Sequence, residues 1–484
     1  RLPNFVFPTN LLTRWGLLPQ WGLLTQWGQQ SATGAPPPPM KRPERFHRRY
    51  PTVLFRHCPT PMTDVSVVTV FLRHRGDVLL LRRSADVASY AGQWGTVAGH
   101  VEADDPEASA RQEIREETGL PDGDVTLVRR GEPFVVEDAD RATRWHMHPY
   151  LFDASTRDVT PNWETDTVAW TAPTALLRRD TVPDLWTSYT RVAPSVETVT
   201  ADRTHGSAYL SMRALEVLRD RAGARAAPND TAEASADLID TATALLAARP
   251  SMTALATRIH RVMHACAPDV AASDVEQTAH EAIARAATAD RRAAERAAEH
   301  IAGRHVLTLS RSGSVLSALR RADPAPSVVV AASYPLGEGV AVAEDLAAEG
   351  LDVTLVPDAS VAAHLADGTV NAVLVGADTV LPDGGVLNKT GTRMTALAAH
   401  REGIPVYVVC AEDKIAPEPF APDEYVARTD VYDGEAPLAV DTRLFDTTPP
   451  DWLTAILTDT HACAPADIPD VARRLAALRD WQTD

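Results

Sequence analysis

A short, strongly acidic helix limits the folds that this chain can adopt. Residues 107–118 are predicted to form it, because a proline stands before the segment and Gly119, a common helix terminator, follows it. Residues three and four positions apart lie on one face of a helix, so Glu113 lies beside both Glu116 and Glu117. Like charges crowded in this way repel one another. The segment is therefore either a solvated acidic face or a place where carboxylate oxygens hold Mg²⁺ or Mn²⁺.

Segments typical of β-strands lie on both sides of this helix. They are short apolar and β-branched runs separated by polar turns, and the turn 73–77 makes the first two runs a hairpin. A sheet that brackets the acidic helix is therefore predicted. Its expected strands are 65–72, 78–81, 125–129, 133–136 and 145–152.

The segment from Gly99 to Leu120 resembles the Nudix box, whose pattern is G-x5-E-x7-R-E-U-x-E-E-x-G-U with U apolar. The first glycine, the three clustered glutamates and the final Gly-Leu pair match it. The segment is one residue shorter than the pattern near residues 105–106, Asp105 takes the place of the first glutamate, and Gln112 stands where the family has an arginine. The resemblance implies a Nudix α/β/α sandwich that hydrolyses a nucleoside diphosphate linked to another group.

The same resemblance implies the roles of the acidic side chains. Glu113, Glu116 and Glu117 would bind Mg²⁺ or Mn²⁺, which neutralises a pyrophosphate and lowers the pKa of a bound water. One of these glutamates, or Glu164 on a later loop, would take the proton. The residues alone do not decide between them. A merely solvated acidic face is the alternative, and the flanking glycines, apolar positions and strands favour the Nudix interpretation.

The second half of the chain has a different periodicity. Helices are expected at 206–222, 232–248, 252–265 and 273–301. After residue 303, short buried strands alternate with helical segments, which is typical of a doubly wound parallel sheet. Ligands bind such sheets at the carboxyl ends of the strands, so one crevice is predicted among three loops. These loops are 310–314, 333–339 and 376–378.

This half resembles the family that joins the alpha, beta and delta subunits of translation initiation factor 2B with methylthioribose-1-phosphate and ribose-1,5-bisphosphate isomerases. The matching motifs are Val375-Gly376-Ala377-Asp378, Leu381-Pro382-Asp383-Gly384, Asn388-Lys389-x-Gly391-Thr392 and Phe445-Asp446-x-Thr448-Pro449. The isomerases of this family use a cysteine and an aspartate to move protons between adjacent sugar carbons. The resemblance places Asp378 at the catalytic aspartate, and it implies a homodimer.

Two departures from that family bear on catalysis. Ser310 stands at the position of the cysteine, and a hydroxyl is far less acidic than a thiol with a pKa of ~8.5. Tyr334 stands at the position of an arginine that would grip a sugar phosphate. We therefore predict that this half binds a sugar phosphate or nucleotide, or mediates assembly, without the isomerase reaction.

Substrate contacts are predicted in both halves. The turn at Ser312 and Gly313 opens a helix whose N–H groups could hold a phosphate, although it could equally be a plain helix cap. The predicted substrate-binding residues are Gly99, Ser310, Ser312, Gly313, Asn388 and Lys389.

The charge of the chain limits the classes of molecule that it is expected to bind. The formal net charge is −18, and the chain has three lysines against 44 arginines among 47 basic residues. An acidic surface with so little lysine resembles the proteins of salt-in halophiles, and it argues against nonspecific binding to nucleic acid. No apolar run is long enough to span a membrane. Four scattered cysteines without C-x-x-C spacing favour a reducing cytoplasm.

The first 61 residues differ from the rest. They carry eight basic residues and one acidic residue, and the motif Leu-Leu-x-x-Trp-Gly occurs three times between residues 11 and 28. We expect this stretch to be a disordered arm or upstream translation before a natural start at Met62, with a docking peptide as the alternative. The other expected domains are a Nudix domain at 62–193, a helical subdomain at 194–302 and a Rossmann-like subdomain at 303–484.

Three functional hypotheses follow from this organisation. The leading one is a fused protein, in which a Mg²⁺-dependent Nudix hydrolase is joined to a domain that binds a sugar phosphate or nucleotide. The second is a sugar-phosphate isomerase whose Nudix half only binds nucleotide. The third is a regulatory or scaffold protein without catalysis.

Overall fold

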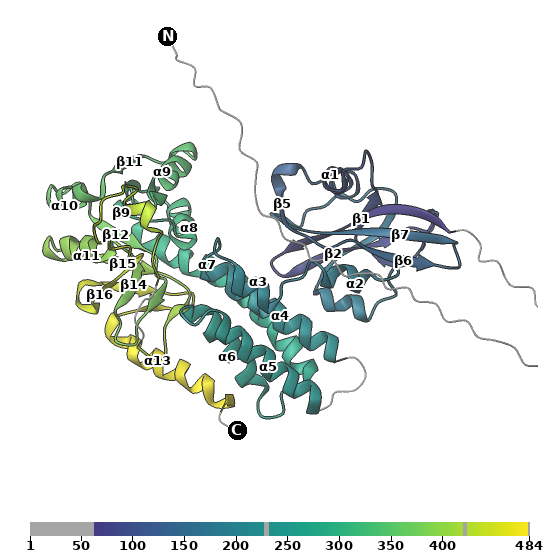
Figure 1. Ribbon diagram of the computed structural model, residues 1–484. Coiled ribbons are helices and arrows are strands. Elements are labelled where there is room, and N and C mark those ends of the chain that lie inside the picture. Colours follow the sequence, from purple (N-terminus) through teal and green to yellow (C-terminus); the bar gives the residue numbers. More distant parts are fainter. Residues whose placement is uncertain (1–61, 227–231, 420–423, 483–484) are drawn as a thin grey trace, which may run out of the picture. The chain divides into compact units, whose positions relative to one another are not determined.

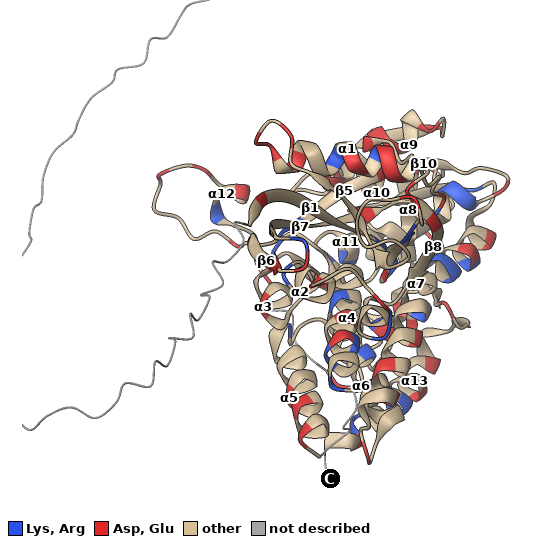
Figure 2. Ribbon diagram, turned by 90° about the vertical axis from the view of Figure 1, so that its right-hand side faces the viewer, with Lys and Arg blue, Asp and Glu red and all other residues tan. Residues whose placement is uncertain are grey.

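The computed structural model describes residues 62–226, 232–419 and 424–482 (Figure 1). The expectations for residues 1–61 lie outside this part of the chain. None of the described helices is long and apolar enough to cross a lipid bilayer. Acidic side chains are spread along many helices, for example α1 and α5 (Figure 2).

The first domain is built on an eight-stranded mixed sheet. Its central strand β1 (Thr63–His74) pairs with β2 and β4 in antiparallel and with β7 in parallel orientation. The predicted hairpin of β1 and β2 is confirmed, with Arg73 opposite Val78. The other strands are β2 (Asp77–Arg83), β3 (Trp94–Gly95), β4 (Val97–His100), β5 (Val125–Arg130), β6 (Phe134–Asp138), β7 (Thr143–Ala154) and β8 (Thr165–Thr171).

Helices cover both faces of this sheet, so the predicted α/β/α sandwich is confirmed. Side chains alternate between the two faces of a strand. Leu79 and Leu81 therefore pack with Ile114 of α1 (Pro106–Thr118), while Leu80 packs with Leu185 of α2 (Leu185–Thr190) on the other face. A short 3₁₀ helix, η2 (Pro173–Leu177), completes that second layer.

The acidic helix α1 begins and ends as its sequence predicts. Asp105 caps its start, with its Oδ1 accepting from the N–H of Ala108 at 3.1 Å, and Gly119 ends it at a φ of 72°. The loop before the helix turns through Ala103 and Asp104, both at positive φ, which is costly for residues with a side chain. This sharp turn lies where the segment is one residue shorter than the Nudix pattern.

The helical subdomain follows, and its long helix serves two cores. The first part of α7 (Ala272–Ile301) buries Ala279 and Ile283 against the other helices, and its last part buries Ala293 and Ala297 against the C-terminal sheet. Alanine side chains therefore form much of the packing surface of this helix in both cores. The other helices are α3 (Val196–Ala201), α4 (Ser207–Arg225), α5 (Ala232–Ala248) and α6 (Thr253–Cys266).

The last subdomain holds a seven-stranded sheet in the order β11-β10-β9-β12-β15-β17-β18. All pairs are parallel except the last, which confirms the predicted parallel sheet. The chain runs outward in one direction from β9 and in the other from β12, so the switch point lies between these two strands. The strands are β9 (His305–Thr308), β10 (Ser327–Ala331), β11 (Val353–Val356), β12 (Ala372–Val375), β15 (Val406–Val409), β17 (Ala455–Leu457) and β18 (Ala462–Cys463).

Helices flank this sheet. The same subdomain also holds a small second sheet, which was not predicted from the sequence. It is antiparallel and consists of β13 (Thr379–Val380), β14 (Val386–Lys389) and β16 (Phe445–Thr448). It holds three of the four motifs that mark the initiation-factor resemblance. The helices are α8 (Gly313–Arg321), α9 (Glu338–Ala348), α10 (Val361–Ala366), α11 (Thr392–Arg401), α12 (Arg428–Val431) and α13 (Ile468–Ala476).

A buried histidine on α6 makes the stability depend on pH. The indole N–H of Trp481 donates to Nδ1 of His260 at 3.0 Å, and burial, followed by the charge of Arg479, lowers the pKa of His260 to about 4. An unfolded histidine has a pKa of ~6.5, so unfolding takes up a proton between these values. The neutral histidine therefore contributes stability above pH ~6.5 that is lost as the pH falls toward 4.

We expect the substitution His260→Gln to remove this pH dependence. Between pH 7 and 5 the free energy of unfolding should fall by about 1–2 kcal/mol more in the unsubstituted protein than in the variant. Urea unfolding at both pH values measures the difference. Equal losses in the two proteins would show that His260 does not titrate in this way.

Candidate functional site

The acidic helix lies against strand β4, and a glycine sets how closely. A Cβ atom added to Gly99 would lie 1.7 Å from Oε1 of Glu113 and 2.6 Å from its Cγ, so a larger residue cannot stand there without displacing Glu113. One turn further along α1, Glu117 is buried, and its Oε1 accepts from the N–H of Ala98 at 3.3 Å. The Nudix-box glycine thus allows two glutamates of the helix to contact the strand.

These two glutamates are poorly compensated by positive charge. Burial, followed by the charges of Glu116, Glu164 and Glu102, raises the pKa of Glu113 to about 7. Burial also raises the pKa of Glu117 to about 8, although the N–H of Ala98 and the charge of Arg83 oppose the shift. A carboxylate in such surroundings is stabilised by any cation that enters.

Glu164 reaches the same place from another element. It lies in the loop just before β8, where its backbone N–H donates to Oδ1 of Asn162 and its carbonyl accepts from the N–H of Ser84. With Glu113, Glu117 and Gly99 it lines a cavity of about 280 Å³. The structure therefore brings together one strand, one helix and one loop that are far apart in the sequence.

Glu116 takes a different position from its two neighbours. It is exposed, its Oε1 accepts from Nε2 of Gln112 at 2.9 Å, and it does not line the cavity. Within the described residues, no three acidic, histidine or cysteine side chains are close enough together to hold a metal ion. The donor set nonetheless fits a divalent cation, since its carboxylate oxygens are hard ligands and at least two of them lack a compensating charge.

Two aromatic side chains also line the cavity, and they were not predicted from the sequence. Tyr90 and Trp145 line it with their ring centroids 6.5 Å apart, and the hydroxyl of Tyr90 donates to Asp138 at 2.6 Å. Arg83 also lines the cavity, and its Nε donates to the carbonyl of Ser89. Residues of this kind are common in strands, so only their convergence in space identifies them.

A second group of predicted residues meets at the switch point of the parallel sheet. The N–H of Ser310 donates to Oγ of Ser333 at 2.6 Å, and a Cβ on Gly376 would lie 2.7 Å from Oγ of Ser312. The three loops that were expected to surround one crevice are therefore adjacent. Ser312 caps α8, which begins at Gly313, by accepting from the N–H of Val315 at 3.4 Å.

Asp378 lies at the end of β12, with its N–H bonded to the carbonyl of Leu387. Burial raises the pKa of Asp378, while the charges of Lys414 and Lys389 oppose the shift. Lys389 donates to Oε1 of Glu338 at 2.7 Å.

Other polar groups near Asp378 are held by protein partners. The amide of Asn388 donates to Oγ1 of Thr392 at 2.9 Å, and Lys414 donates to the carbonyl of Ala377 at 2.7 Å. Lys414 and Glu338 were not predicted. The scarcity of lysine in this chain was the one available signal for Lys414.

Comparison with known proteins assigns both halves. The model of the initiation factor 2 subunit family matches residues 203–465, more than half of the chain. The chain belongs to the initiation factor 2 subunit family. Residues 62–192 match the NUDIX domain model, so this member carries a NUDIX domain ahead of its family domain.

Relatives of this family member include isomerases and initiation-factor subunits. A putative methylthioribose-1-phosphate isomerase of Sulfolobus acidocaldarius is 36% identical over 124 residues, which cover 24% of this chain and 34% of that protein. A ribose 1,5-bisphosphate isomerase of Archaeoglobus fulgidus is 31% identical over 173 residues, covering 34% and 55%. A putative translation initiation factor eIF-2B subunit 2-like protein of Pyrococcus horikoshii is 30% identical over 166 residues, covering 34% and 59%. The chain thus spans between about a third and three fifths of the length of these relatives.

Solved structures of the same kind are also similar. The translation initiation factor eIF-2B of Pyrococcus horikoshii OT3 is 24% identical with a TM-score of 0.47, covering 56% of this chain and 95% of that one. The 5-methylthioribose 1-phosphate isomerase of the same organism is 20% identical with a TM-score of 0.47, covering 64% and 90%.

Proposed function

We propose that the NUDIX domain hydrolyses a nucleoside diphosphate linked to another group, with Mg²⁺ or Mn²⁺. The observation that carries this proposal is the convergence of Glu113, Glu117 and Glu164 in one cavity that Gly99 keeps open. A solvated acidic helix face would leave these side chains in water. Here Glu117 is buried and Glu113 is half-buried, and a cation bound beside them would offset the cost of burying their charges.

The acidic side chains divide into two roles in this proposal. Glu113 and Glu117 would hold the cation, and Glu116 would join them on giving up its bond to Gln112 outside the cavity. When bound, the cation neutralises the pyrophosphate and lowers the pKa of a water. Glu164 enters from a separate loop, so it is free to accept the proton of the attacking water.

The rest of the cavity is suited to the substrate. Arg83 lines the same cavity as the glutamates, and its guanidinium can pair with a phosphate oxygen. Tyr90 and Trp145 offer flat apolar surface to a nucleoside. The cavity therefore offers groups for a phosphate and for a nucleoside together.

A panel of ADP-ribose and nucleoside diphosphate sugars tests the proposal, with Mg²⁺ and high salt in the assay. We expect metal-dependent cleavage of at least one member, and the variant Asp378→Asn should cleave it at an unchanged rate. Loss of cleavage in Asp378→Asn would show that the C-terminal domain, not the NUDIX domain, carries the activity.

For the C-terminal domain we propose binding of a sugar phosphate or nucleotide, without isomerisation. Asp378 and Lys389 support a polar site at the switch point, whereas Ser310 in place of a cysteine leaves no acidic thiol there. Ribose 1,5-bisphosphate offered to the protein should therefore bind and remain an aldose. Conversion to the ketose that disappears in Asp378→Asn would establish the isomerase alternative.

We also propose that this domain self-associates as a homodimer. Four large apolar side chains, Tyr334, Leu336, Met394 and Leu397, are 68%, 46%, 47% and 49% exposed on it. Large apolar side chains that gather on one surface mark protein interfaces, and the proposal takes these four as part of such a surface. Sedimentation of the full chain should show a dimer, and Leu397→Glu should shift it toward the monomer.

A further inference from the structure

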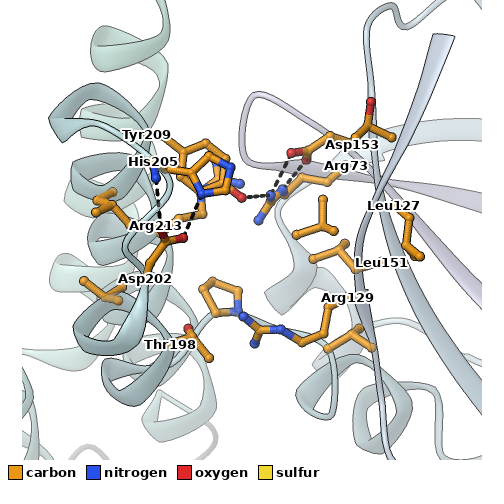
Figure 3. A pocket seen from close by; sticks show the side chains of 16 residues that line it. Arg73, Leu127, Arg129, Leu151, Asp153, Thr198, Asp202, His205, Tyr209 and Arg213 are labelled. Carbon is orange, nitrogen blue, oxygen red and sulfur yellow. Dashed lines mark hydrogen bonds and ion pairs between the residues drawn. The ribbon is translucent and has the colours of Figure 1, made fainter. Parts of the chain in front are cut away.

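A second cavity, of about 180 Å³, lies between the NUDIX sheet and the start of α4 (Figure 3). Arginine side chains reach it from both sides. Arg73 and Arg129 come from strands β1 and β5, and Arg213 comes from α4. Neither the proposed hydrolysis nor the proposed sugar-phosphate binding uses this cavity.

Arg213 is buried with part of its guanidinium unpartnered. It is 8% exposed, its Nη2 lies 2.9 Å from Oε1 of Glu216, and its Cζ lies 4.7 Å from the ring centre of Tyr209. Its Nε and Nη1 are buried and have no hydrogen-bond partner. A buried donor left without a partner is unfavourable, so the site favours any acceptor that enters the cavity.

Arg73, by contrast, is fully engaged by protein groups. Its Nε and Nη2 donate to the two carboxylate oxygens of Asp153 at 2.7 and 3.0 Å, and its Nη1 donates to Oε2 of Glu216 at 3.0 Å. Figure 3 shows these bonds to Asp153 and the contact with the hydroxyl of Tyr209. Asp153 and Glu216 are thus already shared with Arg73.

Arg129 adds positive charge that these two carboxylates do not balance. Its Nη1 donates to the carbonyl of Ala193 at 2.8 Å, and no carboxylate of the described residues forms an ion pair with it. Burial, and the charge of Arg73, lower the pKa of Arg129. Three guanidinium groups therefore line the cavity, and Arg129 is the one among them that no carboxylate pairs with in the described residues.

The remaining carboxylate of the cavity, Asp202, is committed elsewhere. It accepts from the backbone N–H groups of Thr204 and His205 at 2.8 and 3.0 Å, and its Oδ2 lies 2.8 Å from Nδ1 of His205. These contacts lower the pKa of Asp202 to about 2, against the effect of its burial. Asp202 therefore stays ionised, and an anion is favoured by the unpartnered Nε and Nη1 of Arg213 and by the unpaired guanidinium of Arg129, not by a net positive charge of the cavity.

We propose that this cavity binds a phosphate group, either as inorganic phosphate or as a small phosphate monoester. The planar guanidinium presents its donors in a fork that matches phosphate oxygens, and the apolar neighbours Leu127 and Leu151 keep the local dielectric low. The ligand would contact the NUDIX sheet through Arg129 and the family domain through Arg213. This site does not depend on the proposed hydrolysis.

Calorimetric titration of the full chain tests the proposal, with inorganic phosphate in one arm and ribose 5-phosphate in the other. Chelator is present so that no metal occupies the acidic cavity, and ionic strength is held constant with chloride. We expect binding in at least one arm, weakened about tenfold or more in Arg129→Gln and in Arg213→Gln. The exposed Arg191, which does not line the cavity, supplies the matched control Arg191→Gln, and its binding should be unchanged.

The variants keep the test decisive. Arg213→Gln removes a partner of Glu216 and could fail to fold, whereas Arg129 holds only a backbone carbonyl, so Arg129→Gln should leave the fold intact. Tighter binding of ribose 5-phosphate than of phosphate would identify a monoester as the ligand, and the reverse would identify the free anion. Unchanged binding in Arg129→Gln, or no binding in either arm, would overturn the proposal.

Discussion

Replacing Glu113 by glutamine is expected to abolish hydrolysis while leaving the protein folded. The rate should fall by about 10²–10⁴-fold, the range that a single catalytic group usually supplies. Without divalent cation the variant should be at least as stable as the unsubstituted protein, because the amide removes a buried charge whose pKa is raised to about 7. Steady-state assays and thermal unfolding, each with and without Mg²⁺, measure the two effects.

The cation supplies an internal control for this prediction. Mg²⁺ should raise the unfolding temperature of the unsubstituted protein and have a much smaller effect on Glu113→Gln, because a ligand that binds only the folded state stabilises it. Glu107→Gln is the matched variant, since Glu107 lies on the same helix and pairs with Arg111 and Arg130 outside the cavity. Equal losses of activity in the two variants would contradict the assignment of Glu113.

The second large effect is expected at Gly99. In Gly99→Ala the new methyl group would occupy the space of the Glu113 carboxylate, whose Oε1 lies 1.7 Å from that position. The side chain must turn out of the cavity or α1 must move away from β4, so activity should fall by about 10²-fold or more. The cost in unfolding free energy should be smaller, about 1–3 kcal/mol.

A second glycine of the same domain, Gly123, supplies a control for the steric effect of the added methyl group. Gly123 has open space where its Cβ would lie and no positive φ, so Gly123→Ala should keep both activity and stability. Unfolding in urea and the hydrolysis assay compare the two substitutions directly. Full activity in Gly99→Ala would show that the close contact between β4 and α1 is not needed.

The sequence predicted α1 well because its signals are local. A proline before the helix, a left-handed glycine after it and glutamates at helical spacing specify both its bounds and its acidic face. The same signals could not reveal which glutamate is buried. That Glu116 bonds to Gln112 while Glu117 bonds to Ala98 depends on how the helix docks on β4.

The small antiparallel sheet escaped prediction for a related reason. Strand β14 buries Asn388 and Lys389, two polar residues that interrupt any apolar alternation, and β13 is two residues long. The buried amide of Asn388 is bonded to Thr392, and the buried ammonium of Lys389 is bonded to Glu338. The residue motif identified the family at this place, but it carried no periodicity from which a strand could be predicted.

The most direct measurement is the release of phosphate-bearing product from a nucleoside diphosphate compound by the full chain in Mg²⁺ and high salt. The account predicts turnover of at least one such compound that chelator stops, that Glu113→Gln abolishes and that Asp378→Asn leaves unchanged. Cleavage that continues in chelator, or that survives in Glu113→Gln, would contradict it. If no ADP-ribose or nucleoside diphosphate sugar is cleaved, the NUDIX domain only binds its ligand, and the proposed hydrolysis is wrong.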